Sequence, residues 1–196
     1  MTFEHRTTLF AAGRFRAFEM GSRDVPQLQR FFEENPDYYL IVSDEPPKPD
    51  EAHEEVHGAL PEGWPYTKKW IIGFGDEDGQ LVGMANVVSD LLASKVWHIG
   101  FFLIATSLYG SDAGRSLYQA LEYWMRAQGA TWLRLGVVEG NVRAERFWKG
   151  RGYVEVRKRT GIAFGQRVNT VSVQVKPLAG GAIADYLAMV ERDRPD

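Results

Sequence analysis

Hydrophobic residues follow two spacings along the chain, and each spacing predicts one kind of element. Alternating or continuous apolar runs are typical of strands, whereas apolar residues three and four positions apart are typical of helices. The first spacing predicts strands at residues 14–20, 70–75, 81–88, 96–104, 132–138, 153–159 and 168–175. The second predicts helices between Ser22 and Pro36, within 50–60, through 117–124, between Asn141 and Gly152, and within 182–190.

Turn and capping residues mark several of the expected boundaries. Gly79 can supply the positive φ of a hairpin turn at residues 76–79. Gly129 can close the helix that precedes it, and Asn141 can cap the next one. Residues 96–104 are apolar on both faces, as expected of a central buried strand. Strands and helices in this order predict an α+β fold with a mixed sheet.

Length and composition exclude several classes of protein. A chain of 196 residues is the size of one domain, and we expect a single domain over 1–196, with a core at about 14–175 and a tail at 176–196. The 23 basic and 26 acidic residues give a net charge of −3, which excludes a strongly basic protein that binds nucleic acid non-specifically. The absence of cysteine excludes disulfides, thiolate nucleophiles and cysteine-ligated metals.

The sequence shows no apolar segment of membrane-spanning length. Its longest strongly apolar run, at residues 99–105, is much shorter than the ~20 residues that a membrane helix needs. No secretory signal is recognisable at the N-terminus. We therefore expect a cytoplasmic protein.

A glycine-bearing turn follows the predicted strand at 96–104. Residues 109–115, with the sequence YGSDAGR, join that strand to an amphipathic helix. Such a turn can expose several backbone N–H groups at a helix N-terminus, where the helix dipole favours an anion such as a pyrophosphate. The alternative is a tight turn whose glycines serve geometry alone, because short glycine motifs are weakly specific.

A second motif follows the predicted strand at 132–138, where residues 141–153 read NVRAERFWKGRGY. The two stretches together resemble the signatures of the Gcn5-related N-acetyltransferase family. Its signature Asn-x-x-Ala-x-x-φ-Tyr-x-x-x-Gly-Phe/Tyr, with φ apolar, is matched in register by Asn141, Ala144, Phe147, Gly152 and Tyr153. Its signature Gln/Arg-x-x-Gly-x-Gly/Ala is matched by Gly114, while Gly110 and Arg115 fit frequent variations. The resemblance covers about residues 14–175, because the order of elements also agrees.

This resemblance implies a fold, a cosubstrate and an activity. The fold would be a mixed, mostly antiparallel sheet flanked by helices, with a splay between the fourth and fifth strands. Acetyl-CoA, or another acyl-CoA, would bind in that splay, and its acetyl group would pass to a primary amine by direct attack. Asn141 would hold the pantetheine or cap its own helix. The residues expected to contact the cosubstrate are Phe102, Leu103, Ile104, Tyr109, Gly110, Ser111, Asp112, Ala113, Gly114, Arg115, Asn141 and Trp148.

Three residues depart from the family pattern. Tyr109 replaces a Gln or Arg, Asp112 replaces a glycine, and Trp148 replaces the tyrosine that protonates the departing thiolate in many members. A carboxylate repels a pyrophosphate at short range, and an indole N–H is no useful acid. Protonation of the thiolate would then fall to water, Tyr109 or Tyr118. The departures also leave open a catalytically degenerate module that binds or senses acyl-CoA.

Two residues are candidates for removing the proton of the acceptor amine. His98 lies eleven residues before Tyr109, an offset at which histone-acetylating members of the family carry a general-base Glu. An imidazole with a pKa near ~6.5 suits a base at neutral pH, and burial would lower that pKa further. The alternatives are a hydrogen-bonded core histidine without a chemical role, Glu139 after the next predicted strand, or ordered water.

A metal-binding motif competes with this interpretation. His53-Glu54-Glu55-Val56-His57 is a literal H-E-x-x-H, which on a helix places two histidines on one face. Prolines confine the helix to about three turns, and only His5 and His98 remain as further histidine ligands. We therefore expect no metal here, and we keep a metal-dependent hydrolase that uses His53 and His57 as a minor alternative.

The region between the first two predicted strands would form a wall of the acceptor site in the resembled fold. It is acidic and aromatic, with Glu33, Glu34, Asp37, Tyr38, Tyr39, residues 50–55, Trp64 and Tyr66. Such a wall attracts a cationic amine, although most runs of charge are solvated surface. We expect a small-molecule amine or a protein amine as partner, with neither nucleic acid nor a membrane involved, and we leave a homodimer open.

Overall fold

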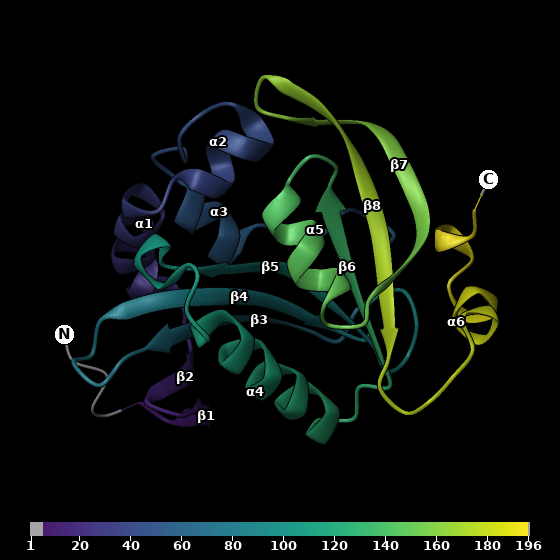
Figure 1. Ribbon diagram of the computed structural model, residues 1–196, viewed down its shortest axis with the longest axis horizontal. Helices are drawn as coiled ribbons and strands as arrows, with labels where there is room; N and C mark the ends of the chain where they lie inside the picture. The colour runs from purple at the N-terminus through teal and green to yellow at the C-terminus, as the bar shows by residue number, and fades with distance from the viewer. Residues whose placement is uncertain (1–5, 196) are drawn as a thin grey trace.

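Eight strands form one mixed sheet in the computed structural model, which describes residues 6–195 (Figure 1). The strands are β1 Thr8–Ala12, β2 Phe15–Glu19, β3 Lys68–Gly75, β4 Leu81–Ser89, β5 Val96–Ile104, β6 Trp132–Val138, β7 Val154–Phe164 and β8 Arg167–Pro177. Their order across the sheet is β1-β2-β3-β4-β5-β6-β8-β7. Neighbouring strands are antiparallel except β5 and β6, which are parallel. The mixed, mostly antiparallel sheet predicted from the sequence is confirmed.

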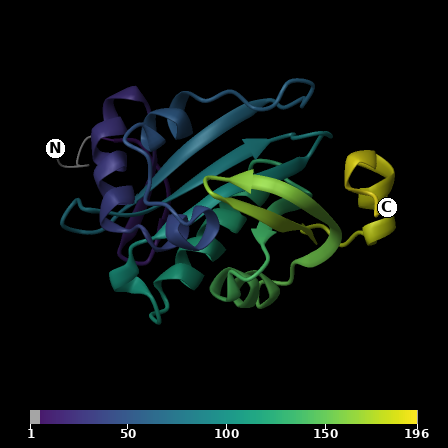
Figure 2. The same ribbon diagram turned by 90° about the horizontal axis from the view of Figure 1, so that it is seen from above.

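Helices cover both faces of this sheet. They are α1 Val25–Glu34, α2 Asp37–Ser43, α3 Glu51–His57, α4 Ala113–Ala127, α5 Val142–Lys149 and α6 Ile183–Met189, with short 3-10 turns at Ser22–Asp24, Thr106–Leu108 and Glu191–Asp193. Because side chains alternate along a strand, Met84 of β4 packs towards α1–α3 while Ala85 packs towards α4 and α5. Figures 1 and 2 show α6 at the far end of the sheet from α1.

The two parallel strands separate halfway along their length. They pair only from Val96 opposite Trp132 to Ile99 opposite Leu135. On its other side β5 carries a bulge, because Val87 of β4 lies opposite Ile99 whereas Asn86 lies opposite Phe101. Gly100 is therefore the extra residue, and a bulge bends its strand and interrupts the ladder. This is the splay predicted between the fourth and fifth strands. Those two strands are β5 and β6 here, because the unpredicted strand β1 precedes them.

Two elements of the structure have no counterpart among the predicted ones. Strand β1 lies before the predicted core, where it pairs with β2 and places the Phe10 ring 5.8 Å from that of Trp124. No element was predicted at helix α2, because Pro36 was expected to end the helix before it. Pro36 has φ −76 and ψ −10, so it is already helical and serves as the N-cap of α2. The proline thus ends one helix and begins another.

The expected terminal helix is present as α6, and it packs with the end of the sheet. Tyr186 and Val190 are buried against Val96, Trp132 and Val175. Within residues 6–195, no helix combines the length and the apolar character that crossing a membrane requires.

Candidate functional site

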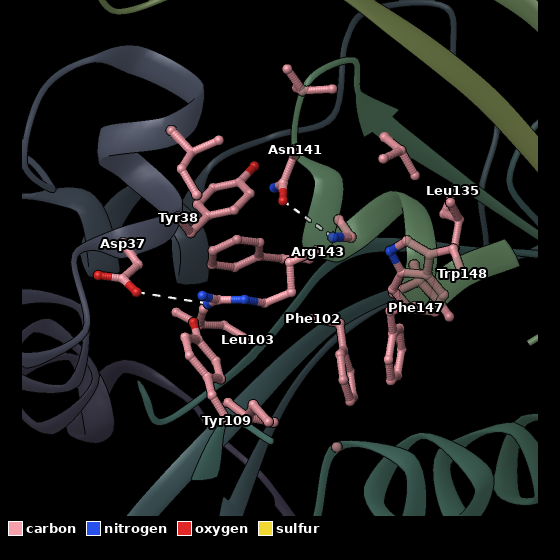
Figure 3. Close-up of a pocket in the computed structure, with 18 of the residues that line it drawn as sticks. Asp37, Tyr38, Phe102, Leu103, Tyr109, Leu135, Asn141, Arg143, Phe147 and Trp148 are labelled. Atoms are coloured by element: carbon pink, nitrogen blue, oxygen red, sulfur yellow. Dashed lines mark hydrogen bonds and ion pairs between the residues drawn. The ribbon is translucent and has the colours of Figure 1, made fainter. Parts of the chain in front are cut away.

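A cavity of about 380 Å³ occupies the splay between β5 and β6 (Figure 3). Residues 99–104 of β5 form one wall and residues 135–138 of β6 form the other. The turn into α4, helix α5 with its flanking residues Asn141 and Arg151, and helix α2 complete the rim. The cavity therefore gathers residues from five separate elements around the place where the parallel ladder ends.

The strand edges inside this cavity carry free hydrogen-bonding capacity. Beyond Ile99, β5 has no pairing with β6, whose own residues from Gly136 onward pair only with β8. Backbone N–H and C=O groups on that edge of β5 therefore face the cavity, and such groups require a partner when they are shielded from water. An extended molecule with amide groups can pair with this edge as an additional strand would.

The turn into α4 points backbone donors at the same cavity. Gly110 has φ +77, a conformation that glycine adopts without steric cost. The first four N–H groups of α4, from Asp112 to Arg115, have no acceptor within the helix, and that of Ala113 donates to Oγ of Ser111 at 3.2 Å. A Cβ at Gly114 would lie 3.1 Å from Cδ1 of Ile104, so glycine lets the helix start approach β5 closely. The arrangement suits a phosphate group.

Cationic side chains surround the rim. Arg115, Arg143 and Arg151 line the cavity, against the single carboxylate of Asp37 among its lining residues. The Arg143 guanidinium lies 3.7 Å from Asp37 and 3.7 Å from the centre of the Tyr109 ring (Figure 3). Nε of Arg151 is buried and has no hydrogen-bond partner among the described residues. A buried donor without a partner is costly, and an anionic ligand would satisfy it.

Asp112 does not line the cavity, although the sequence placed it beside the expected pyrophosphate. Its carboxylate forms an ion pair with Arg115, one turn further along α4, and accepts a hydrogen bond from Oγ of Ser116 at 3.2 Å. The Asp112 and Arg115 side chains are both more than half exposed. Repulsion of a phosphate by Asp112 is therefore reduced by Arg115 and by solvent.

Trp148 packs in an aromatic cluster on the floor of the cavity. It is 7% exposed, and its ring centre lies 4.9 Å from Phe147, 5.3 Å from Tyr118 and 5.8 Å from Phe102. The same helix begins at Asn141, whose Oδ1 accepts a hydrogen bond from the Ala144 N–H at 3.2 Å. Asn141 thus caps α5, one of the two roles that the sequence left open, while also lining the cavity.

The two tyrosines that could protonate a thiolate differ in access. Tyr109 lines the cavity; burial raises the pKa of its phenol, and the Arg143 charge opposes that rise. Tyr118 is buried beneath the cavity, where its hydroxyl donates to Glu122 and lies 3.1 Å from the Tyr153 hydroxyl. Burial raises the pKa of Tyr118 strongly. Of these two, Tyr109 is the one in contact with the cavity.

His98 lies at the paired end of β5 and is not among the residues that line the cavity. Its Nδ1 is 3.1 Å from the carbonyl oxygen and 3.3 Å from Nη1 of Arg134. Burial lowers the pKa of His98 to about 3, and the charge of Arg134 adds to that effect. The predicted role of His98 in removing the amine proton stays a prediction, and its position gives that role no support.

Glu139 also lies outside the cavity lining. Its half-exposed carboxylate forms an ion pair with Lys158 of β7. Its role as the alternative base is likewise untested.

The two histidines of the H-E-x-x-H motif sit one turn apart on α3. Their ring centres are 4.7 Å apart, and His53 also contacts Glu54 at 3.7 Å. In the part of the chain that the structure describes, no three His, Asp or Glu side chains converge in a way that could hold a metal. That the pair binds no metal remains a prediction, which elemental analysis of untagged protein would test.

Sequence reasoning placed most of the cavity but missed its charged rim. Of the twelve expected cosubstrate contacts, Asp112 and Ala113 are the two that do not line the cavity. The largest omissions are Arg143 and Arg151. Both arginines occupy variable positions of the second motif, so only their charge beside Asn141 could have singled them out. Asp37 was expected in the wall of the acceptor site, and it lies on the rim of this cavity, on helix α2, which was not expected.

Comparison with known proteins gives one family and many similar folds. Residues 26–153 match the family model described as Acetyltransferase (GNAT) family. No curated protein sequence matches this chain.

Among solved structures, an acetyltransferase from Thermus thermophilus has a TM-score of 0.65 and 19% identity, covering 84% of this chain and 97% of that one. A spermidine N-acetyltransferase from Vibrio cholerae, in complex with CoA and spermine, has a TM-score of 0.64 and 16% identity, covering 84% and 96%. The ribosomal-protein-S18-alanine N-acetyltransferase from Escherichia coli has a TM-score of 0.61 and 12% identity, covering 86% and 96%. At these low sequence identities, the similarity to these three structures shows a shared fold and nothing about substrate.

Proposed function

The chain belongs to the Acetyltransferase (GNAT) family, and from that membership we propose that it transfers an acetyl group from acetyl-CoA to a primary amine. The observation that carries this proposal is the cavity between β5 and β6, where an open strand edge, a helix N-terminus and three arginines face the same space. Each of these features fits a different part of one elongated, anionic thioester.

The residues of the cavity fit acetyl-CoA by their chemistry. The open edge of β5 offers backbone groups to the amides of pantetheine, and the aromatic floor offers apolar contact. The N–H groups at the start of α4 suit the pyrophosphate. Arg151, whose buried Nε has no partner in the described part of the chain, and Arg115 add positive charge at the rim. When bound, acetyl-CoA supplies an activated acyl carbonyl and a thiol leaving group.

Residues of the bulge are suited to stabilise charge during transfer. The extra residue Gly100 interrupts the ladder, so backbone N–H groups near it are free to donate to the acyl oxygen. Gly100 has no side chain, which leaves room for the acceptor to approach from the side of Asn86. No enzyme nucleophile is needed for direct attack, which agrees with a chain that contains no cysteine.

Proton movements require a base for the ammonium and a donor for the thiolate. Tyr109 lines the cavity and can donate a proton or a hydrogen bond to the departing sulfur. Water, His98 and Glu139 remain the predicted acceptors of the amine proton. A degenerate module that binds acyl-CoA without turnover is the second candidate, favoured by the buried, apolar packing of Trp148 where many family members carry a tyrosine.

Calorimetric titration with acetyl-CoA, followed by an acetylation assay over a panel of amines, tests the proposal. We expect one acetyl-CoA per chain and release of free CoA thiol that depends on an added amine. Binding without thiol release on any amine would favour the degenerate module. Absence of binding would refute both candidates.

A further inference from the structure

A second cavity, of about 270 Å³, adjoins the first on the side of α2 and α3. The two share Tyr38, Val42, Gly100 and Phe101 as lining residues, so they meet at the bulge of β5. The second cavity is further bounded by Asn86 of β4 and by the tip of the β7–β8 hairpin at Phe164 and Gly165. A molecule in it would face the bulge from the side opposite the splay.

The hairpin tip is fixed against α2, which makes this second cavity a defined space. The Gln166 N–H donates to the carbonyl oxygen of Ser43 at 3.1 Å, and the amide nitrogen of Asn169 donates to that of Val42 at 3.0 Å. Arg167 contacts Asp44 at 3.2 Å. In Figure 1 the hairpin tip lies beside α2 at the top of the molecule. The cavity is therefore closed on that side by paired groups.

Three carboxylates line this cavity, and none forms an ion pair among the described residues. Glu55 accepts a hydrogen bond from the Asn86 amide at 2.6 Å. Glu51 accepts from the backbone N–H of Lys48 at 3.3 Å, and Glu45 accepts from the Gln166 amide at 2.9 Å. All three donors are neutral. By contrast, Asp37 and Asp44 on neighbouring turns each contact an arginine.

Cations near the cavity form no ion pair with these carboxylates among the described residues. Lys48 is the cationic residue in the lining, and it is exposed. Lys69 approaches Glu55, but its ammonium donates to the carbonyl oxygens of Glu55 and Gly58 at the end of α3. Burial raises the pKa of Glu55 and the Glu51 charge adds to the rise, whereas the Asn86 hydrogen bond and the Lys69 charge oppose it. A half-buried carboxylate whose pKa is still raised gains from a cation supplied by a ligand.

The remaining wall is aromatic. The Phe101 ring lies 4.6 Å from Tyr38 and 6.1 Å from Tyr39, and the two tyrosine rings are 5.3 Å apart. Faces of aromatic rings attract ammonium groups, and their edges pack against methylene chains. Oδ1 of Asn86 is buried, has no hydrogen-bond partner within residues 6–195, and can accept a hydrogen bond from an ammonium. The lining thus suits an aliphatic chain that ends in positive charge.

We propose that this second cavity is the acceptor site and that it selects small aliphatic amines with two or more positive charges, with Glu55 as the main contact for the cation. That the bound amine is the acceptor rests on the acetyl transfer proposed above. Binding of the amine can be measured without any transfer. A monocation leaves part of the carboxylate charge unpaired. A zwitterion such as an amino acid brings a carboxylate into an acidic space, which is repulsive.

Three amines with the same six-carbon chain separate charge from size: 1,6-diaminohexane, hexylamine and 6-aminohexanoate. We expect calorimetry at pH 7.5 to give 1,6-diaminohexane an affinity about tenfold above hexylamine and about a hundredfold above 6-aminohexanoate, as one and two unit-charge contacts would give. Glu55→Gln keeps the size and the acceptor for Asn86, and should lower the affinity for the diamine about tenfold. Equal affinities for hexylamine and 1,6-diaminohexane would refute the proposed selection for amines with two positive charges.

Glu54→Gln is the matched control, because Glu54 precedes Glu55 on α3 but is 68% exposed and lies outside the cavity. We expect it to bind the diamine as the wild type does. Equal losses in both variants would point to long-range charge, and unchanged binding in Glu55→Gln would place the amine elsewhere; either result overturns the proposal. Thermal unfolding of each variant checks that the fold is kept.

Measuring both amine binding and release of CoA thiol distinguishes a failure of this proposal from a failure of the proposed function. If the diamine binds through Glu55 but no thiol is released from acetyl-CoA, the amine site stands and acetyl transfer fails. If thiol release occurs with 6-aminohexanoate in preference to the diamine, transfer stands and the selection fails.

Discussion

The two ends of the β5–β6 pair have opposite arrangements of polar groups. At the paired end the backbones bond to each other, and the buried side chain of Arg134 binds Asp193 through two bonds of 2.7 and 2.9 Å. At the splayed end the backbone edge of β5 is left without a strand, and Nε of Arg151 has no hydrogen-bond partner among residues 6–195. The paired end satisfies its backbone groups and the Asp193 carboxylate within the chain, whereas the proposed ligand would supply partners at the splayed end.

The paired end also anchors the C-terminal segment. Tyr186 of α6 donates to Asp193 at 2.5 Å, and Arg159 of β7 contacts the same carboxylate at 3.1 Å. Hydrogen bonds and the charge of Arg134 hold the pKa of Asp193 below its usual value despite burial. The buried charges of Arg134 and Asp193 thus have their partners within the chain, and we expect them to contribute to stability.

The largest expected effect is on stability at the paired end. Arg134→Met leaves Asp193 buried with fewer cationic partners, and we expect the free energy of unfolding to fall by about 3 kcal/mol. Denaturant titration measures it. The control is Arg194→Ala, which breaks a pair with Glu191 in the same segment whose members are 49% and 77% exposed. It should cost under about 1 kcal/mol. Similar losses in both variants would contradict the assigned role of Arg134.

At the splayed end the largest expected effect is on binding. Gly114→Val places a branched side chain where a Cβ already approaches Ile104 to 3.1 Å, so α4 must shift or the cavity must narrow. We expect CoA to bind about a hundredfold more weakly by calorimetry, equivalent to about 2.7 kcal/mol. Ala127→Val, at the exposed end of the same helix, controls for the branched residue. Wild-type affinity in Gly114→Val would place the pyrophosphate elsewhere.

The pH dependence of stability should report His98 at the paired end. Below its usual pKa of 6.5, unfolded His98 gains a proton that the folded state, with a pKa of about 3, does not bind. Stability therefore falls as the pH drops below 6.5, by up to about 1.4 kcal/mol per pH unit. His98→Asn should flatten this slope between pH 6.5 and about 5, above the range where protonation of carboxylates begins to affect stability. An unchanged slope would contradict the buried neutral state.

Kinetics of the same variant decide whether His98 also acts in chemistry. From its place outside the cavity we expect His98→Asn to keep kcat/KM and the acidic limb of its pH profile. A large loss with an altered limb would establish the sequence-based role in proton removal. Glu139→Ala, measured in parallel, tests the alternative base. If neither variant changes the limb, ordered water carries the proton.

The smallest expected effect on CoA binding concerns the charge on the rim of the cavity. Asp112→Asn removes the ion-pair partner of Arg115 without altering the backbone turn, which frees a guanidinium beside the expected phosphates. Because both side chains are more than half exposed, the gain is screened, and we expect CoA to bind about two- to threefold more tightly at low salt. The difference should disappear at about 0.5 M salt. Weaker binding would show that Asp112 positions Arg115.

Local features explain which elements could be predicted. Strand β5 and strand β6 have the bounds expected from their apolar runs, because each is buried on both faces. Helix α2 could not be predicted from the same pattern, because Pro36 signals an end in sequence while its φ also suits a beginning. Strand β1 is short and lies at the sheet edge, where few buried positions mark it.

Strands β2 to β8, most of the helices and the glycine turn before α4 could be predicted from the sequence, because spacing of apolar residues and backbone preferences act over a few positions. The family could be recognised as well, since the motif after β6 is contiguous. The charge pairs became visible only in the folded chain. His98 meets Arg134 across 36 residues, Arg134 meets Asp193 across 59, and Asn86 meets Glu55 across 31. Such contacts depend on sheet register and on helix placement, which no local pattern encodes.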